Sequence, residues 1–389
     1  MYVNPFLGVL FHWLGGLASG SFYVPYRGVR RWSWETAWLT GGFFSWIIMP
    51  WLMGLILTND LTTVLGTAFR DQPKAVMWIY IFGAMWGMGG LTFGLTMRYL
   101  GLSLGMAVAL GYCAAVGTLI PPIFNDTFAS KLITPLAGNF VLIGIVVCLV
   151  GIAIAGLAGI RKEREMSAEE KQKAIKEFSF WKGVGIATFS GIMSACFSFG
   201  LGAGDPLKEI TLAHGTPKHW EGLPVLVVLL AGGFTTNFIW CVILNIKNGT
   251  GREYFSPVTI RESSAGYLNE HGSASGGTST PAGSPVPLLR NIFFAGLAGC
   301  VWYMQFFFYT IGESMMGDYQ FSSWTLHMAS IIIFSSLWGI YLKEWKGASS
   351  RTFRTLLFAL GVLIFSTVVV GYGNYLAQQT PATPSEKSP

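Results

Sequence analysis

Two histidines are the side chains of this sequence best suited to carry a proton inside a membrane. His12 and His327 each lie within a long apolar run, and no Asp or Glu lies near the centre of any such run. Imidazole has an unperturbed pKa near 6.5, so it is the remaining side chain that titrates near neutrality. His12 lies about eight residues into its run, roughly 12 Å deep, and His327 lies about five residues from the same side. A proton-sensitive site is one interpretation, and a satisfied hydrogen bond between helices is the other.

Aromatic residues crowd the run that begins near residue 288. Trp302, Gln305 and Tyr309 are spaced so that they share one face of a helix. A sugar offers an apolar face to an aromatic ring and hydroxyl groups to amide or imidazole groups, a combination typical of ligand pockets. We therefore predict a sugar site that includes these residues and Trp86, with an aromatic surface facing lipid as the alternative for Trp302 and Tyr309.

Two carboxylates lie at the edges of apolar runs. Glu35 begins its run, where it either favours the helix dipole or forms a gating ion pair with one of the arginines before it. Those arginines are Arg27, Arg30 and Arg31. Glu344 lies beside Lys343 and Lys346, which predicts a local ion pair.

The elements that must position these residues are ten long apolar runs. A bilayer core about 30 Å thick is spanned by roughly 20 helical residues. With 52% hydrophobic and only 11% charged residues, the chain differs from soluble proteins, which average about 25% charged. We predict an all-α membrane protein with spans near residues 4–24, 34–57, 76–97, 102–124, 136–159, 181–204, 223–246, 288–311, 322–342 and 353–376. Pro50 and the pair Pro121 and Pro122 are expected to kink or stop their helices.

Basic residues fall almost entirely in every second gap between the runs, which predicts the orientation. The odd gaps hold Arg27, Arg30, Arg31, Arg98, Arg161, Lys162, Arg164, Lys171, Lys173, Lys176, Lys182, Lys247, Arg252, Arg261, Arg290, Lys343, Lys346, Arg351 and Arg354. The even gaps and the two ends hold only Arg70, Lys74, Lys131, Lys208, Lys218 and Lys387. By the positive-inside rule the odd gaps are cytoplasmic and both termini lie outside. The charges form no single stripe, so nucleic acid binding is not favoured.

One motif occurs twice. The segment Gly16 to Phe22 in the first run resembles the segment Gly191 to Phe197 in the sixth, although a short match of small residues can also arise from composition. Each half then has five helices, an odd number, so the halves enter the membrane in opposite senses. We predict two inverted five-helix repeats, residues 1–159 and 181–376, a layout that suits a transporter.

The remaining segments are polar. Residues 160–180 are expected to be a charged cytoplasmic linker, and residues 248–287 a mobile cytoplasmic loop whose part 271–287 is dispensable. The tail 377–389 is expected to be disordered.

Five cysteines without CxxC spacing predict packing rather than a metal or redox centre, and no cofactor is expected. Small-xxx-small pairs such as Gly83 and Gly87 predict close helix packing.

Several motifs together resemble the bacterial L-rhamnose/proton symporter family. They are His12–Ser19, Phe22–Pro25, Arg31–Thr36, Gly83–Gly87, Gly94–Gly101, Trp302–Tyr309 and Leu342–Trp345, and they run along nearly all spans. The resemblance covers the positions His12, Glu35, Gln305 and His327, whereas the segment 271–287 has no counterpart in it. It implies a ten-helix member of the drug/metabolite transporter superfamily in the bacterial inner membrane. The implied function is uptake of L-rhamnose or a related deoxy sugar with protons.

Two other classes of function remain open from the residues alone. An exporter or uniporter on the same scaffold would transport independently of a pH gradient. A membrane-embedded enzyme would need a clustered site of acidic, histidine or serine residues at the end of a span, and the sequence has no such cluster. The lipid bilayer, a small sugar and a proton are the expected partners, and the sequence carries no prediction of oligomeric state.

Overall fold

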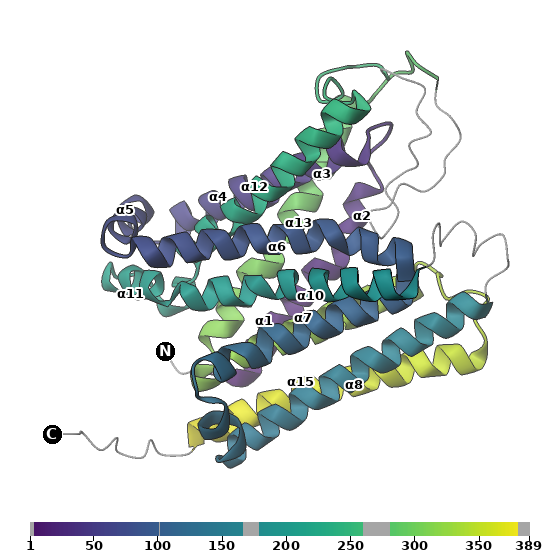
Figure 1. Ribbon diagram of the computed structural model, residues 1–389. Helices are drawn as coiled ribbons and strands as arrows, with labels where there is room; N and C mark the ends of the chain where they lie inside the picture. The colour runs from purple at the N-terminus through teal and green to yellow at the C-terminus, as the bar shows by residue number, and fades with distance from the viewer. Residues whose placement is uncertain (1–3, 101, 166–178, 260–280, 380–389) are drawn as a thin grey trace.

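The predicted membrane spans are present in the computed structural model, which describes residues 4–100, 102–165, 179–259 and 281–379 (Figure 1). Within these residues, ten helices are long and apolar enough to cross a membrane. They cover Pro5–Tyr26, Trp34–Leu57, Pro73–Met97, Leu104–Phe124, Leu136–Glu165, Trp181–Ala213, Lys218–Asn248, Leu288–Ser314, Gly317–Tyr341 and Ser350–Gln379. The prediction of an all-α membrane protein with this number of spans is confirmed.

The helices follow one another with short connections. In chain order they are α1 (Pro5–Ser21), α2 (Tyr23–Tyr26), α3 (Trp34–Phe43), η1 (Phe44–Ile48), α4 (Met49–Leu57), α5 (Leu61–Asp71), α6 (Pro73–Leu100), α7 (Leu102–Phe124), η2 (Ala129–Ile133), α8 (Leu136–Glu165), α10 (Phe180–Ala203), α11 (Asp205–Ala213), η3 (Lys218–Trp220), α12 (Leu223–Asn248), α13 (Leu288–Ser314), η4 (Gly317–Ser322), α14 (Ser323–Tyr341) and α15 (Ser350–Gln379). The short helices α5 and α11 lie at the same end of the bundle as the start of α1 and the end of α15 (Figure 1). We call this the α11 end.

Prolines interrupt helices where the sequence predicts it. The second span changes to one π-helical turn, η1, directly before Pro50, which lies in the first turn of α4. Proline cannot donate the hydrogen bond that would continue a regular helix, so the ladder shifts locally. In α7 the pair Pro121 and Pro122 lies in the last turn, and the helix ends at Phe124.

Segments far apart in the sequence pack side by side. α1 packs against α13 and α14, whereas α10 packs against α6 and α7. α8 lies along α15 (Figure 1), and α12 packs against α3 and η1. Helices from the two halves of the chain therefore interleave, and residues of both halves share one interior.

Glycines let these helices approach closely. A methyl group added at Gly83 of α6 would overlap the main-chain oxygen of Leu229 in α12, and one at Gly87 would lie 2.8 Å from the oxygen of Gly233. Without a hydrophobic force between helices in lipid, such backbone approach is what allows van der Waals contact. The packing interpretation of this small-xxx-small pair is confirmed. Gly94 of the same helix has no atom within 4 Å of an added methyl group.

The long polar loop is partly ordered. Its two described arms pair through the Thr259 amide, which donates to the oxygen of Ser284, and the Val286 amide, which donates to the oxygen of Pro257. Val286 is 8% exposed and belongs to the hydrophobic core, and it is the one buried residue among the described residues 281–287 of the segment that we expect to be dispensable. The predictions for residues 166–178, 260–280 and 380–389 lie outside the described residues. The helix α8 continues through the first charged residues of the predicted linker, to Glu165.

We expect Gly83→Ala to destabilise the protein, because its methyl group must push α6 and α12 apart. Overpacking of this kind costs about 1–3 kcal/mol. Thermal unfolding of the purified protein in detergent, followed by circular dichroism, measures the loss. Gly94→Ala on the same helix is the matched control and should leave the midpoint nearly unchanged. Equal midpoints for the two variants would contradict the packing role of Gly83.

Candidate functional site

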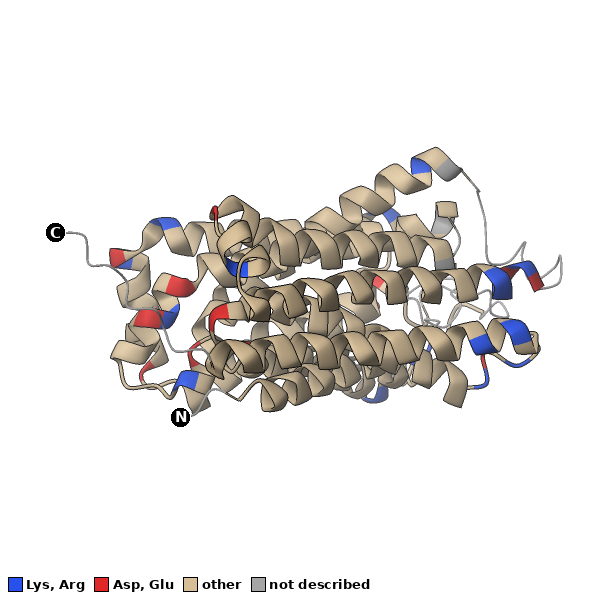
Figure 2. Cartoon of the chain, turned by 90° about the horizontal axis from the view of Figure 1, so that it is seen from below, with Lys and Arg blue, Asp and Glu red and all other residues tan. Residues whose placement is uncertain are grey.

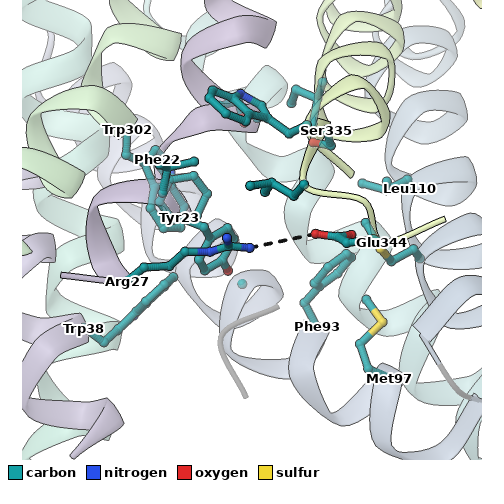
Figure 3. Close-up of a pocket in the computed structure, with 18 residues that line it drawn as sticks. Phe22, Tyr23, Arg27, Trp38, Phe93, Met97, Leu110, Trp302, Ser335 and Glu344 are labelled. Carbon is teal, nitrogen blue, oxygen red and sulfur yellow. Dashed lines mark ion pairs between the residues drawn. The ribbon is translucent and has the colours of Figure 1, made fainter. Parts of the chain in front are cut away.

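A cavity of about 290 Å³ opens in the half of the bundle away from the α11 end. Figure 3 shows its walls. The helix α2 and the residues that flank it contribute Phe22, Tyr23 and Arg27, and α3 contributes Trp38. Other helices add Phe93, Met97, Leu110, Trp302 and Ser335. Its volume lies near the lower end of the roughly 300–1,000 Å³ typical of small-molecule sites. The walls are mainly apolar with few polar groups, as in such sites.

An ion pair spans this cavity. The guanidinium of Arg27 lies 3.9 Å from a carboxylate oxygen of Glu344, and both residues line the cavity (Figure 3). The predicted local pair of Glu344 with the neighbouring lysines is wrong. Lys343 adopts a left-handed conformation with φ of 61°, so the chain folds back after α14 and the Glu344 carboxylate lies against Gly339 and Arg27. At 42% and 28% side-chain exposure the pair is not deeply buried.

Tryptophans form the floor of the cavity. The ring of Trp302 lies 5.0 Å from that of Trp38 and 5.7 Å from that of Trp46, with edge-to-face geometry. The buried indole nitrogens of Trp46 and Trp302 have no hydrogen-bond partner in the described structure, whereas that of Trp38 donates to Asn237 over 3.0 Å. Unpaired buried N–H groups are costly, and Trp302 lines the cavity, so its indole N–H is a donor available to a bound ligand. Trp302 thus faces the cavity, and the alternative of a lipid-facing surface is wrong for it.

A series of aromatic contacts leads from the cavity toward the α11 end. Trp86 touches Trp46 and Phe306, with ring centroids 6.0 Å and 5.4 Å apart. Phe197 then stacks on Phe306 at 4.6 Å and on Trp324 at 5.8 Å. The predicted residue Trp86 is therefore a link in this series, and the interior between cavity and α11 end is filled by rings.

The two histidines meet at the far end of this series. The centroid of the His12 imidazole lies 5.1 Å from that of the Tyr309 ring, and the centroid of the His327 imidazole lies 5.3 Å from the same ring. Both histidines and Tyr309 are at most 2% exposed. Both ring nitrogens of His12 and the Nδ1 atom of His327 lack a hydrogen-bond partner in the described structure. The alternative of a satisfied hydrogen bond is therefore wrong for the ring of His12.

Glycines make room for the imidazoles. A methyl group at Gly15 would lie 3.3 Å from the ring of His327, and one at Gly312 would lie 3.0 Å from the ring of His12. The helix α1 can therefore approach both α13 and α14. Gln305 is 5% exposed and its main-chain oxygen faces Gly15. The ring of His327 lies against the same glycine, so Gln305 and His327 lie at one level of the bundle, and the Gln305 side chain has no hydrogen bond among the described residues.

Glu35 serves a different contact from the one predicted. One of its carboxylate oxygens accepts hydrogen bonds from Asn248 over 2.9 Å and from the Thr250 hydroxyl over 2.8 Å. It lies in the first turn of α3, which agrees with the helix-dipole interpretation, and it binds the chain that follows α12. The pairing of an arginine with Glu35 does not occur in the described structure, where Arg27 instead contacts Glu344.

A second carboxylate holds the beginning of α3. One oxygen of Glu253 accepts from the Ser33 amide, the Ser33 hydroxyl and the Thr36 hydroxyl, each over 2.8 Å. Burial raises the pKa of Glu253, the nearby charge of Glu35 raises it further, and the hydrogen bonds from Ser33 and Thr36 oppose these shifts. The beginning of the second span and the loop after α12 are therefore joined by two acidic side chains, Glu35 and Glu253.

Sequence reasoning missed a buried ion pair at the α11 end. Glu313 of α13 is 9% exposed, and one of its carboxylate oxygens lies 3.5 Å from the Nζ atom of Lys208 on α11. The predicted span ended two residues before Glu313, which removed this carboxylate from consideration. The four-residue spacing from Tyr309 was the available signal, because it places both residues on one face of α13.

In the described part of the chain, no group of three or more His, Cys, Asp or Glu side chains is placed to hold a metal ion. The cysteines are free, and four of them are buried in the helix packing.

The sequence matches a family of transporters along most of its length. The profile of the family described as L-rhamnose-proton symport protein (RhaT) matches residues 1–256 and 282–376. The L-rhamnose-proton symporter of Yersinia pestis (strain Pestoides F) is 35% identical over 370 residues, which cover 94% of this chain and 97% of that protein. The L-rhamnose-proton symporter of Salmonella gallinarum (strain 287/91 / NCTC 13346) gives the same identity and coverage. The profile match leaves out residues 257–281, which include much of the segment without a counterpart in the resemblance.

Proposed function

The chain belongs to the L-rhamnose-proton symport protein family, and we propose on that premise that it imports L-rhamnose or a related deoxy sugar with protons. The membrane is the bacterial inner membrane, and the mechanism is alternating access. The family and its relatives are transporters and not enzymes. The observation that carries the proposal is the cavity rich in aromatic rings together with the unpaired histidines beyond it.

Sugar recognition follows from the chemistry of the cavity walls. Trp302 offers a ring face for the apolar side of a deoxy sugar, and its free indole N–H group is a donor for a hydroxyl oxygen. Ser335 adds a hydroxyl group on the opposite wall. A methyl group in place of one hydroxyl suits such a mainly apolar site, which is the reason to favour a deoxy sugar.

Two inverted repeats on the drug/metabolite transporter pattern are part of the proposal. The contacts of α1 with α13 and α14 correspond to the contacts of α10 with α6 and α7 when each helix is replaced by its counterpart five spans away. The pairs α8 with α15, and α3 with α12, each join a helix to its own counterpart. This correspondence supports a pseudo-two-fold relation between residues 1–159 and 181–376, in which either half can rock against the other.

The orientation is proposed from charge. Figure 2 shows a group of Lys and Arg residues at the end of the bundle away from the N and C labels. The positive-inside rule makes that end cytoplasmic, so that the α11 end and both termini are periplasmic. On this assignment the cavity with Arg27 and Glu344 faces the cytoplasm, and the buried histidines lie under a closed outer end. The conformation is then inward-facing.

Proton coupling is assigned to His12 and His327. Their rings touch Tyr309 at the end of the aromatic series that begins in the cavity. A protonated imidazole that donates to a bound hydroxyl group is stabilised by it, so that sugar and proton favour each other's binding.

We expect a cysteine at Gln72 to react from the periplasm and one at Phe255 to react only from the cytoplasm. Gln72 lies between α5 and α6, and Phe255, which is 84% exposed, follows α12. The five native cysteines are first replaced by serine. An impermeant maleimide is applied to spheroplasts and to inverted vesicles. Labelling of Phe255→Cys in intact spheroplasts would reverse the proposed orientation.

We expect Trp302→Ala and Gln305→Ala each to weaken L-rhamnose binding without unfolding the protein. A lost stacking ring or a lost amide hydrogen bond costs about 1 to 2 kcal/mol, which is roughly 5- to 30-fold in affinity. Titration calorimetry on the purified variants measures the change. Trp78→Ala is the control, because this tryptophan of α6 is 48% exposed on the outside of the bundle. Unchanged affinity in both site variants would place the sugar elsewhere.

We expect His12→Gln to keep sugar exchange down a gradient and to lose uphill uptake. One proton crossing 100 mV supplies about 2.3 kcal/mol, enough for roughly 50-fold accumulation of a neutral sugar. Counterflow and acid-driven accumulation of labelled L-rhamnose in proteoliposomes separate the two activities. Full accumulation by the double variant His12→Gln, His327→Gln would remove the histidines from coupling and direct attention to Glu35. Equilibration of L-rhamnose by the unaltered protein, with no accumulation when a pH gradient is imposed, would favour a uniporter.

A further inference from the structure

Three charged side chains close the outer end of the bundle. Lys208 of α11 lies 3.0 Å from a carboxylate oxygen of Asp205 and 3.5 Å from one of Glu313. The side chains of Lys208 and Glu313 are only 10% and 12% exposed, whereas that of Asp205 is 63% exposed. The buried contact between Lys208 and Glu313 therefore joins the short helix α11 to the long helix α13 across the top of the interior.

The surroundings of Glu313 connect it to the histidines. Tyr309 lies one turn earlier on α13 and touches both imidazoles, and the ring of His12 on α1 packs against Gly312. Glu221, which lies between η3 and α12, acts on the same carboxylate through its charge. The charged and titratable groups around Glu313 are thus Lys208 and Asp205 on α11, Glu221 before α12, Tyr309 on its own helix and His12 on α1.

We infer that Glu313 is a proton-binding site of this carrier, and that its ionised form holds the outer end closed through Lys208. The inference rests on the proposed proton-coupled uptake and adds a carboxylate to the histidines. Ionisable groups inside a membrane protein are costly to bury and usually serve transport. The ion pair of Lys208 and Glu313 lies between the periplasm and the buried histidine cluster, which is where a carboxylate that takes up a periplasmic proton must lie.

The step is a simple protonation. A periplasmic proton binds the Glu313 carboxylate and forms the neutral acid, and no electrons are transferred. The ammonium group of Lys208 keeps its charge and its contact with the exposed carboxylate of Asp205. In a buried ion pair, the attraction between the two charges offsets the cost of removing both from water. Neutral Glu313 no longer attracts Lys208 in this way, so α11 is released from α13. The outer end can then open and admit sugar, and return of the proton to the cytoplasm restores the pair.

The first test measures the separation of α11 from α13 directly. Spin labels are placed at Leu212, which is 38% exposed on α11, and at Asp318 in η4, in the full chain with its native cysteines replaced. Electron–electron double resonance in lipid nanodiscs, without sugar, reports the distance at pH 8 and pH 5. We expect a shift to longer distances at pH 5. Glu313→Gln should show the longer distances at both pH values.

Two further variants keep this test decisive. Glu209→Gln removes an exposed carboxylate from α11 and should retain the pH-dependent shift of the parent protein. The double variant Lys208→Met, Glu313→Gln contains no buried charge in this pair, and its distances should not change with pH. A shift in either Glu313→Gln or the double variant as large as that of the parent would overturn the inference, because the histidines remain in both.

The second test uses transport. Glu313→Gln should lose acid-driven accumulation of L-rhamnose in proteoliposomes and keep counterflow. Accumulation equal to that of the unaltered protein would overturn the role of Glu313. Failure of the unaltered protein to accumulate L-rhamnose would instead overturn the proposed function, and the distance measurement without sugar would still decide whether Glu313 binds the proton that opens the outer end.

Discussion

The structure depends on the absence of water from the interior of the bilayer. Every polar group placed there must find a partner within the protein, because an unpaired one costs several kcal/mol. Most of the chain meets this requirement with helices whose main-chain groups bond within the helix, and with hydroxyl groups that donate back to their own helix, as Thr211 does to Leu207. Buried polar groups that lack a partner in the described structure therefore mark places where another molecule can bind.

Several of these groups lie along one route through the protein. Trp302 lines the cavity with Trp46 packed behind it, and the imidazoles of His12 and His327 lie at the other end of the aromatic series. Between them, rings in edge-to-face and stacked contact fill the space. The cavity and the histidines are therefore separated by packed aromatic rings, which must move before any molecule can pass between them.

Ion pairs of different character lie at the two ends of this route. Arg27 and Glu344 border the open cavity and are partly hydrated, so their attraction is weak and easily exchanged for water. Lys208 and Glu313 are buried at the closed end, where breaking the pair leaves a charge without compensation. The difference in burial explains how one end can be open while the other stays shut in the same conformation.

The sequence alone determined the number of spans and their approximate limits, because apolar length is a local property of the chain. It also placed Trp302 and Tyr309 on one helical face through their spacing. Only the tertiary structure decided which side chains meet. Glu344 contacts Arg27 and not its neighbouring lysines because the chain reverses at Lys343. Glu313 entered the site because α13 continues past its apolar run and meets α11, a contact between residues 105 positions apart that no local pattern encodes.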